Sequence, residues 1–169
     1  MTSQLDTAIR FATRAHRNQV RKYTGDPYIT HPLAVMEIVR TVESHTEDML
    51  IAAVLHDVVE DCDVTIQDIC DQFGTVVGMY VEYLTDVSTP AMGNRRARKE
   101  WDAWHYSRGP AESQTIKIAD LIHNTADIHK HDPRFWEVYK HEKWFSLNLL
   151  TDADPTLWNS ARIQLKELW

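Results

Sequence analysis

The chain has 169 residues, of which 43% are hydrophobic and 25% charged, a composition typical of a soluble globular protein. Its formal charge of −7 argues against a general nucleic-acid coat, because phosphate backbones attract basic surfaces. The sequence has no apolar run near the roughly 20 residues that a membrane span requires, and its first residues lack a signal-peptide pattern. Only Cys62 and Cys70 are present, so we expect no disulfide framework and predict a cytoplasmic protein.

Helical periodicity dominates the sequence, which contains only five glycines and six prolines. Residues 20–28 are typical of a loop, with its turn at Gly25-Asp26-Pro27. Residues 76–84 are apolar and β-branched enough for a strand, but no other segment offers a strand partner, so we predict a helix. The expected helices cover residues 5–17, 31–42, 48–59, 65–73, 76–84, 94–104, 113–129, 136–151 and 154–168. The sequence therefore predicts an all-α, compact helical bundle that forms a single domain over residues 1–169.

The segment Leu55–Asp61 places four ionisable side chains directly after an apolar run. In a continuous helix, His56 and Glu60 are i,i+4 neighbours, as are Asp57 and Asp61, so all four share one broad face. Burying several charged groups is unfavourable unless something neutralises them, and a metal ion does so most simply. His56 and Asp57 offer such an ion one nitrogen and one oxygen ligand.

Two further residues extend this candidate ligand set. His31 precedes Pro32 at an expected helix start, and Asp120 is an acid within an apolar helix. Taken singly, each is more often a hydrogen-bonded structural group. Together with His56 and Asp57 they form a nitrogen and oxygen set without cysteine, which favours manganese, iron, magnesium or a catalytic zinc over a structural zinc. Such a set usually leaves coordination positions for water and substrate.

Ordered motifs along the chain carry a family resemblance. They are Arg21-Lys22 with Gly25–Pro32, then Ala53–Asp61, Phe73-Gly74, Asn94-Arg95 and Lys117–Asn124. In this order the sequence resembles the HD-domain metal-dependent phosphohydrolases. More narrowly, it is similar to the hydrolase half of the bacterial RelA/SpoT enzymes and to their single-domain relatives, the small alarmone hydrolases (Mesh1-like proteins).

The resemblance implies a helical bundle around one manganese ion with four ligands, which map to His31, His56, Asp57 and Asp120. It implies hydrolysis of the 3′-pyrophosphate of (p)ppGpp to GDP or GTP and pyrophosphate. Glu60 and Asp61 match the family's acidic pair, which positions and deprotonates the attacking water. Positions that match or resemble substrate contacts of the family are Arg21, Lys22, Asn94, Arg95, Asn124, Tyr139 and Lys143.

The identity of the substrate stays open at this point. The loop carries Tyr23-Thr24, one residue longer than in the bifunctional enzymes, and Asp127 falls near a position that contacts the base in some relatives. The alternatives are therefore (p)ppApp, the 2′-phosphate of NADPH, or a non-catalytic nucleotide sensor, although the intact ligands and acidic pair argue against the sensor. We expect a small-molecule nucleotide as partner, no nucleic acid and no membrane, and a monomer or homodimer.

One basic segment also admits two interpretations. Residues 95–99, Arg-Arg-Ala-Arg-Lys, interrupt an otherwise acidic sequence. They form either a solvated helix face or a wall that holds polyphosphate.

Overall fold

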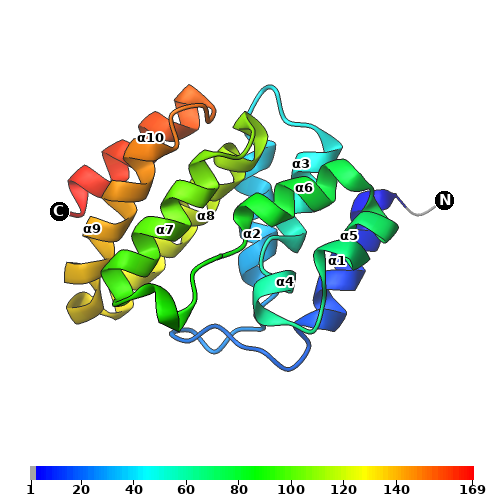
Figure 1. The fold of residues 1–169 in the computed structure, drawn as a ribbon, viewed down its shortest axis with the longest axis horizontal. Coiled ribbons are helices and arrows are strands. Elements are labelled where there is room, and N and C mark those ends of the chain that lie inside the picture. Colours follow the sequence, from blue (N-terminus) through cyan, green and yellow to red (C-terminus); the bar gives the residue numbers. More distant parts are fainter. Residues whose placement is uncertain (1–2) are drawn as a thin grey trace. The chain divides into compact units, whose positions relative to one another are not determined.

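The computed structural model describes residues 3–169; Met1 and Thr2, which belong to the predicted domain, lie outside the described residues. Within this range the chain is helical, and its only β-pairing is an isolated bridge between Val20 and Pro27, so the predicted all-α class is confirmed (Figure 1). The helices are α1 Gln4–Ala15, α2 Thr30–Arg40, α3 Glu47–Leu55, α4 Val58–Asp61, α5 Ile66–Phe73, α6 Thr75–Leu84, α7 Arg95–Ser107, α8 Ala111–His131, α9 Pro133–Leu149 and α10 Pro155–Glu167, with a 3₁₀ turn at Pro90–Met92.

The chain divides into two compact units, one running to Thr85 and the other from Asp86 to Trp169. The first unit is built on α3, whose residues Met49–Leu55 are all buried and which packs against α1, α2 and α6. Helices α5 and α6 approach closely at Gly78, where an added Cβ would lie 2.2 Å from the Cys70 Sγ. A side chain at this position would therefore require the Cys70 thiol to move, whereas the Cys70 Cα, at 3.5 Å, lies at an ordinary contact distance. The single domain remains a prediction.

The second unit is built around α8, which is buried continuously over Ser113–Leu121 and packs against α7, α9 and α10. The Trp136 indole donates to the Leu168 carbonyl at 3.1 Å, and this bond links α9 to the end of α10. The Trp158 indole likewise donates to the Leu147 carbonyl at 2.9 Å. These bonds satisfy the polar edges of two large rings that otherwise contribute apolar surface.

Local sequence signals account for most helix ends. Thr65 forms a capping box with Asp68 at the start of α5, and Gly74, with a φ of 95°, ends that helix as predicted. Asp154 caps α10 by accepting the Leu157 N–H at 2.8 Å. The predicted helices therefore agree with the structure, apart from shifts of a few residues at several ends and from the helix predicted over residues 48–59.

The predicted continuous helix 48–59 is wrong, because the structure interrupts it at His56 and Asp57. Helix α3 ends at Leu55, and α4 begins at Val58. The His56 Nδ1 lies 2.7 Å from the Ala53 carbonyl, which would receive the Asp57 N–H in a continuous helix. The imidazole therefore takes over a backbone acceptor, and the His-Asp dipeptide lies at a helix break.

Within residues 3–169, no helix has the combined length and hydrophobicity that a membrane-spanning helix needs.

Candidate metal centre and substrate-binding residues

Three of the four predicted metal ligands lie together in the first unit. One ligand atom from each of His31, His56 and Asp57 lies within 4.8 Å of the others. The Asp57 Oδ2 lies 3.5 Å from the His31 Nε2 and 3.1 Å from the His56 Nε2. Both imidazoles are buried, at 1% exposure each. Two buried imidazoles and one partly exposed carboxylate are a donor set that suits a divalent transition metal.

Hydrogen bonds from surrounding groups orient this cluster. Because the Ala53 carbonyl can only accept, the His56 Nδ1 carries a proton, and the Nε2 is the ring nitrogen that faces Asp57. The Tyr28 hydroxyl donates to the Asp57 Oδ2 at 2.6 Å. Metal-binding histidines and carboxylates are commonly held in this way by a second layer of hydrogen bonds. The residues present therefore fit a bound metal ion.

Tyr28 is a site residue that the sequence analysis missed. Its ring lies 4.8 Å from that of His16 and 5.9 Å from that of His31, measured between centroids. The guanidinium carbon of Arg21 lies 5.9 Å from the same ring. The available signal was its position three residues before His31, directly after the recognised turn. Tyr28 thereby links the predicted substrate residue Arg21 to the metal cluster.

The loop that carries Arg21 and Lys22 is closed by its own backbone. The Arg21 N–H donates to the Asp26 carbonyl at 2.8 Å, and the Gly25 N–H donates to the Arg21 carbonyl at 3.0 Å. Gly25 has a φ of 76°, a conformation that favours glycine. The Lys22 Nζ lies 3.2 Å from the Tyr23 hydroxyl. The predicted turn is confirmed, and it presents two basic side chains from the unit that holds the metal cluster.

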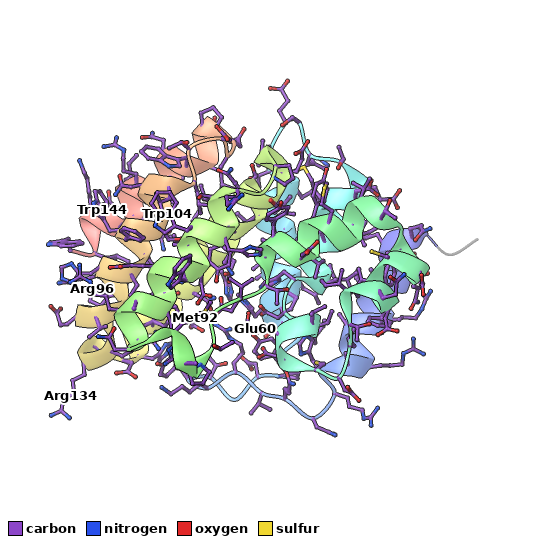
Figure 2. The ribbon with its side chains drawn as sticks, in the orientation of Figure 1. Glu60, Met92, Arg96, Trp104, Arg134 and Trp144 are labelled. Atoms are coloured by element: carbon purple, nitrogen blue, oxygen red, sulfur yellow. The ribbon has the colours of Figure 1, made fainter. Side chains whose placement is uncertain are left out.

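The predicted acidic pair lies in α4, directly after the cluster, and both residues are exposed, with Glu60 labelled in Figure 2. Desolvation and the neighbouring Asp57 carboxylate raise the pKa of Asp61 above its ordinary value. The Asp61 backbone carbonyl accepts a hydrogen bond from the Gln19 side-chain amide at 2.8 Å. The Gln19 Oε1 in turn accepts one from the His16 Nδ1 at 2.7 Å. A carboxylate with a raised pKa is a better proton acceptor, as a general base requires.

The fourth predicted ligand, Asp120, lies in α8 of the second unit and is largely buried. Its Oδ1 accepts the Asn124 amide at 2.6 Å, and its Oδ2 lies 3.4 Å from the Lys117 Nζ. That ammonium lies 4.3 Å from the centroid of the Tyr106 ring. Both oxygens of Asp120 are therefore oriented within the second unit, and its coordination of the metal remains a prediction.

A buried charge network adjoins Lys117. The Lys99 ammonium and the Tyr106 hydroxyl both donate to the carboxylate of Asp86. Burial alone would raise the pKa of Asp86, but Lys117, Lys99 and Tyr106 hold it below its ordinary value. Asp102 is fully buried and also accepts from Lys99, at 3.3 Å. Sequence reasoning missed this network because only Lys99, Asp102 and Tyr106 share a helix, whereas Asp86 and Lys117 come from other segments of the chain.

The remaining predicted substrate residues fall into different settings within the second unit. The Asn94 side chain caps α7 by accepting the Ala97 N–H at 3.0 Å, which gives it a structural role. Arg95 pairs with Glu142 on α9, at 2.7 and 2.9 Å. The Lys143 Nζ lies 4.8 Å from the centroid of the buried Tyr139 ring. Desolvation, followed by the charge of Lys117, lowers the pKa of Lys143 to about 8.

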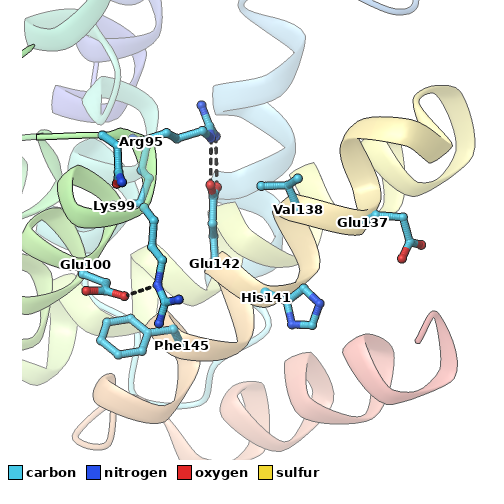
Figure 3. Close-up of a pocket in the computed structure, with 10 residues that line it drawn as sticks. Arg95, Lys99, Glu100, Glu137, Val138, His141, Glu142 and Phe145 are labelled. Atoms are coloured by element: carbon cyan, nitrogen blue, oxygen red, sulfur yellow. Dashed lines mark hydrogen bonds and ion pairs between the residues drawn. The ribbon is translucent and has the colours of Figure 1, made fainter.

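Helices α7 and α9 enclose a cavity of about 650 Å³, here called the α7–α9 groove (Figure 3). Tyr139 and Lys143 are not among the residues that line it, although they belong to α9. The groove mixes basic, acidic and apolar side chains. Its lining residues are Asn94, Arg95, Arg96, Lys99, Glu100, Glu137, Val138, His141, Glu142 and Phe145.

Comparison with known families decides the assignment. The model of the HD domain family matches residues 8–137, more than half of the chain. The chain belongs to the HD domain family. This HD domain is 37% identical over 147 residues to the human guanosine-3′,5′-bis(diphosphate) 3′-pyrophosphohydrolase MESH1, covering 85% of this chain and 79% of that protein. It is also 38% identical over 125 residues to the GTP pyrophosphokinase of Streptomyces coelicolor, covering 72% of this chain but only 14% of that enzyme.

Solved structures agree with this assignment. The HD domain resembles a metazoan ortholog of SpoT that hydrolyses ppGpp, with a TM-score of 0.83 and 26% identity over 99% of this chain and 94% of that one. A Listeria monocytogenes protein matches with a TM-score of 0.68 at 24% identity, over 86% of this chain and 99% of that one, which shows a shared fold. The predicted HD-type helical fold is therefore confirmed.

Proposed function

We propose that this HD domain is a metal-dependent pyrophosphohydrolase that removes the 3′-pyrophosphate of (p)ppGpp to give GDP or GTP and pyrophosphate. The observation that carries the proposal is the His31, His56 and Asp57 cluster, whose ligand atoms lie within 4.8 Å of one another. The likeness to enzymes named for this reaction supports the choice of substrate. An intact, buried and oriented donor set favours a hydrolase over a non-catalytic sensor.

The proposed cofactor is Mn²⁺, with His31, His56 and Asp57 as ligands and Asp120 as the fourth. A divalent ion bound here lowers the pKa of a coordinated water and offsets the negative charge of the phosphate. The nitrogen and oxygen donors support manganese, since they are the ligand types that it accepts. The bond from Tyr28 and the bond to Ala53 hold Asp57 and His56 in place before any ion binds.

The acidic pair Glu60 and Asp61 activates the attacking water in this proposal. Glu60 and Asp61 accept the proton of the water that attacks the phosphorus next to the ribose, and the bond from that phosphorus to the 3′-oxygen breaks. The partial desolvation of Asp61 supports this role, because it raises the pKa of the carboxylate and with it the affinity for that proton. The acidic pair then returns this proton to the 3′-oxygen, which leaves as a hydroxyl.

Basic and polar side chains hold the nucleotide in this proposal. Arginine can bind phosphate in a bidentate manner and stack on a purine, which suits Arg21 in its loop beside the metal cluster. The low pKa of Lys143 supports a role with phosphate, since a nearby anion would stabilise its protonated form. The proposed substrate contacts are Arg21, Lys22, Asn94, Arg95, Asn124, Tyr139 and Lys143.

The proposal includes a cytoplasmic location, which is supported by the free thiols of Cys62 and Cys70.

The test is product release by the purified protein with Mn²⁺, offered ppGpp, ppApp and NADPH in separate reactions. We expect pyrophosphate from ppGpp, and its loss in the His56→Ala/Asp57→Ala variant. Preferential turnover of ppApp, or phosphate release from NADPH, would keep the chemistry and change the substrate. If a protein shown to bind metal releases no product from any of the three compounds, the proposal is contradicted and a non-catalytic sensor is favoured.

A further inference from the structure

The α7–α9 groove contains a close ion pair between Arg95, the first residue of α7, and Glu142 on α9 (Figure 3). The Arg95 Nε lies 2.7 Å from the Glu142 Oε1, and its Nη2 lies 2.9 Å from the Oε2. These two parallel bonds occupy one edge of the guanidinium. It is the same type of edge that binds a phosphate through two oxygens.

The two partners differ in exposure. The Arg95 side chain is 45% exposed, whereas the Glu142 side chain is only 11% exposed. The Phe135 ring supports the guanidinium from 4.9 Å. Hydrogen bonding to Glu142 raises the pKa of Arg95 above its ordinary value. Glu142 is therefore the more buried partner of the pair, and a ligand in the groove can approach the guanidinium of Arg95. A phosphate that uses the Nε–Nη2 edge of Arg95 must take the place of the Glu142 carboxylate.

The other basic residues of the groove are also paired, but in a different way. Arg96 bonds to Glu100 at 2.9 Å, with an Arg96 side chain that is 88% exposed and therefore free to swing away. Lys99 donates to Asp86 and Asp102 behind the groove wall. Of these three basic residues, Arg95 alone pairs with a largely buried carboxylate on the facing helix, α9. An anion that approaches Arg95 therefore competes with that carboxylate.

We propose that Glu142 sets the affinity and the charge selectivity of the groove, because a phosphate group binds Arg95 by displacing the Glu142 carboxylate. A doubly charged phosphate outcompetes the single charge of Glu142, whereas a monoanion does not. The pair thus excludes weakly charged ligands and favours polyphosphate. This inference rests on the proposed function for the nature of the ligand, a nucleotide carrying pyrophosphate.

The test variant is Glu142→Gln, which removes the charge while its amide oxygen can still accept one N–H from Arg95. The matched control is Glu137→Gln, which removes the same charge from the same helix and the same groove. Glu137 is 67% exposed and pairs with Lys140 at 2.9 Å rather than with Arg95. The difference between the two variants isolates the effect of the Arg95 pair from that of net charge.

The probe is sulfate, a tetrahedral dianion that is not turned over, titrated calorimetrically into the Mn²⁺-treated protein. We expect Glu142→Gln to bind sulfate about two- to fivefold more tightly than Glu137→Gln, the range that partly exposed ion pairs support. Formate, a monoanion, should bind the wild-type protein without measurable heat. In an Arg95→Ala background, Glu142→Gln should give no gain beyond that of Glu137→Gln.

Equal or weaker sulfate binding by Glu142→Gln would overturn the inference, as would an effect that persists without Arg95. If Glu142→Gln unfolds, Glu142→Asp takes its place, because the shorter side chain keeps the charge but withdraws it from Arg95. In Glu142→Gln the KM for ppGpp should fall together with the dissociation constant for sulfate. An unchanged KM would overturn the link to the substrate. Absence of ppGpp turnover in the wild type would contradict the proposed function and leave the sulfate result intact.

Discussion

The Tyr28 hydroxyl donates to the same Asp57 oxygen that lies nearest to the His56 Nε2, at 2.6 and 3.1 Å. Tyr28 therefore fixes the direction of a carboxylate that belongs to the proposed metal site. We expect Tyr28→Phe to weaken Mn²⁺ binding by roughly 10- to 100-fold, the usual effect of removing such a support. Calorimetric titration of Mn²⁺ measures this directly.

The control for this variant is Tyr23→Phe, which removes a hydroxyl that lies near the Lys22 ammonium. It should leave the Mn²⁺ affinity unchanged. Equal affinities of Tyr28→Phe and the wild type would show that the hydrogen bond does not hold Asp57 for the metal.

Removal of the metal should lower both turnover and thermal stability. A ligand that binds only the folded state at 100 times its dissociation constant adds about 2.7 kcal/mol to the free energy of unfolding. We expect EDTA to lower the melting temperature and Mn²⁺ to restore it in the wild type, but not in His56→Ala. A His56→Ala melting curve that still responds to Mn²⁺ would place the ion elsewhere.

Replacing both acids of α4 should separate chemistry from metal binding. Glu60→Gln/Asp61→Asn keeps the shapes of the side chains but removes their ability to accept a proton. We expect Mn²⁺ affinity to stay within a few-fold of the wild type while kcat falls by roughly 10²- to 10⁴-fold, the contribution of general base catalysis. Undiminished kcat would remove this pair from the mechanism.

Lys143 should destabilise the fold at neutral pH. Its pKa is about 8 in the folded protein, against an ordinary value of 10.5, so the unfolded chain binds more protons between these pH values. The free energy of unfolding of the wild type should therefore rise as the pH increases from about 8 toward 10.5. Lys143→Met should add about 1–3 kcal/mol at pH 7, and the gain should shrink as the pH rises.

Urea unfolding at several pH values checks this prediction, with the exposed Lys166→Met as control. A gain that does not depend on pH would mean that the stabilisation comes from apolar packing alone. If Lys143 also contacts phosphate, the same variant should raise the KM for ppGpp.

Asp102 anchors the start of the second unit. Its carboxylate accepts the Val87 and Ser88 N–H groups at 3.1 and 2.9 Å and the Ser88 hydroxyl at 3.0 Å, in addition to Lys99. Asp102→Asn loses the charge and replaces one acceptor by a donor, so we expect a loss of about 3 kcal/mol in the free energy of unfolding.

The matched control is Asp71→Asn, at an exposed position of α5, which should change stability by less than about 0.5 kcal/mol. Chemical denaturation measures both variants. Similar small losses in the two would show that the 86–88 segment does not depend on Asp102.

Patterns local in sequence predicted most of the fold. The cap at Thr65 and the stop at Gly74 are set by residues within one helical turn, and the structure confirms both. The break at His56 was not predictable in this way, because it arises where an imidazole competes for the Ala53 carbonyl. Hydrophobic periodicity contains no information about such a side-chain bond.

The candidate site was likewise predictable only in part. The family order of motifs predicted His31, His56 and Asp57 as ligands, and the structure brings them together. The partners of other residues could not be predicted, since the Arg95 and Glu142 pair spans 47 positions and depends on how α7 packs on α9. The role of Tyr28 depends likewise on the fold of its loop, which brings its hydroxyl to Asp57.

The division at Thr85 and Asp86 also separates two kinds of optical and chemical reporter. All six tryptophans lie in the second unit, with Trp104 and Trp144 labelled in Figure 2, whereas both cysteines lie in the first. Intrinsic fluorescence therefore follows the second unit, and the rate of thiol labelling follows the first, without any introduced residue. If the two units unfold as one cooperative domain, fluorescence and labelling will report the same denaturation midpoint in a single sample.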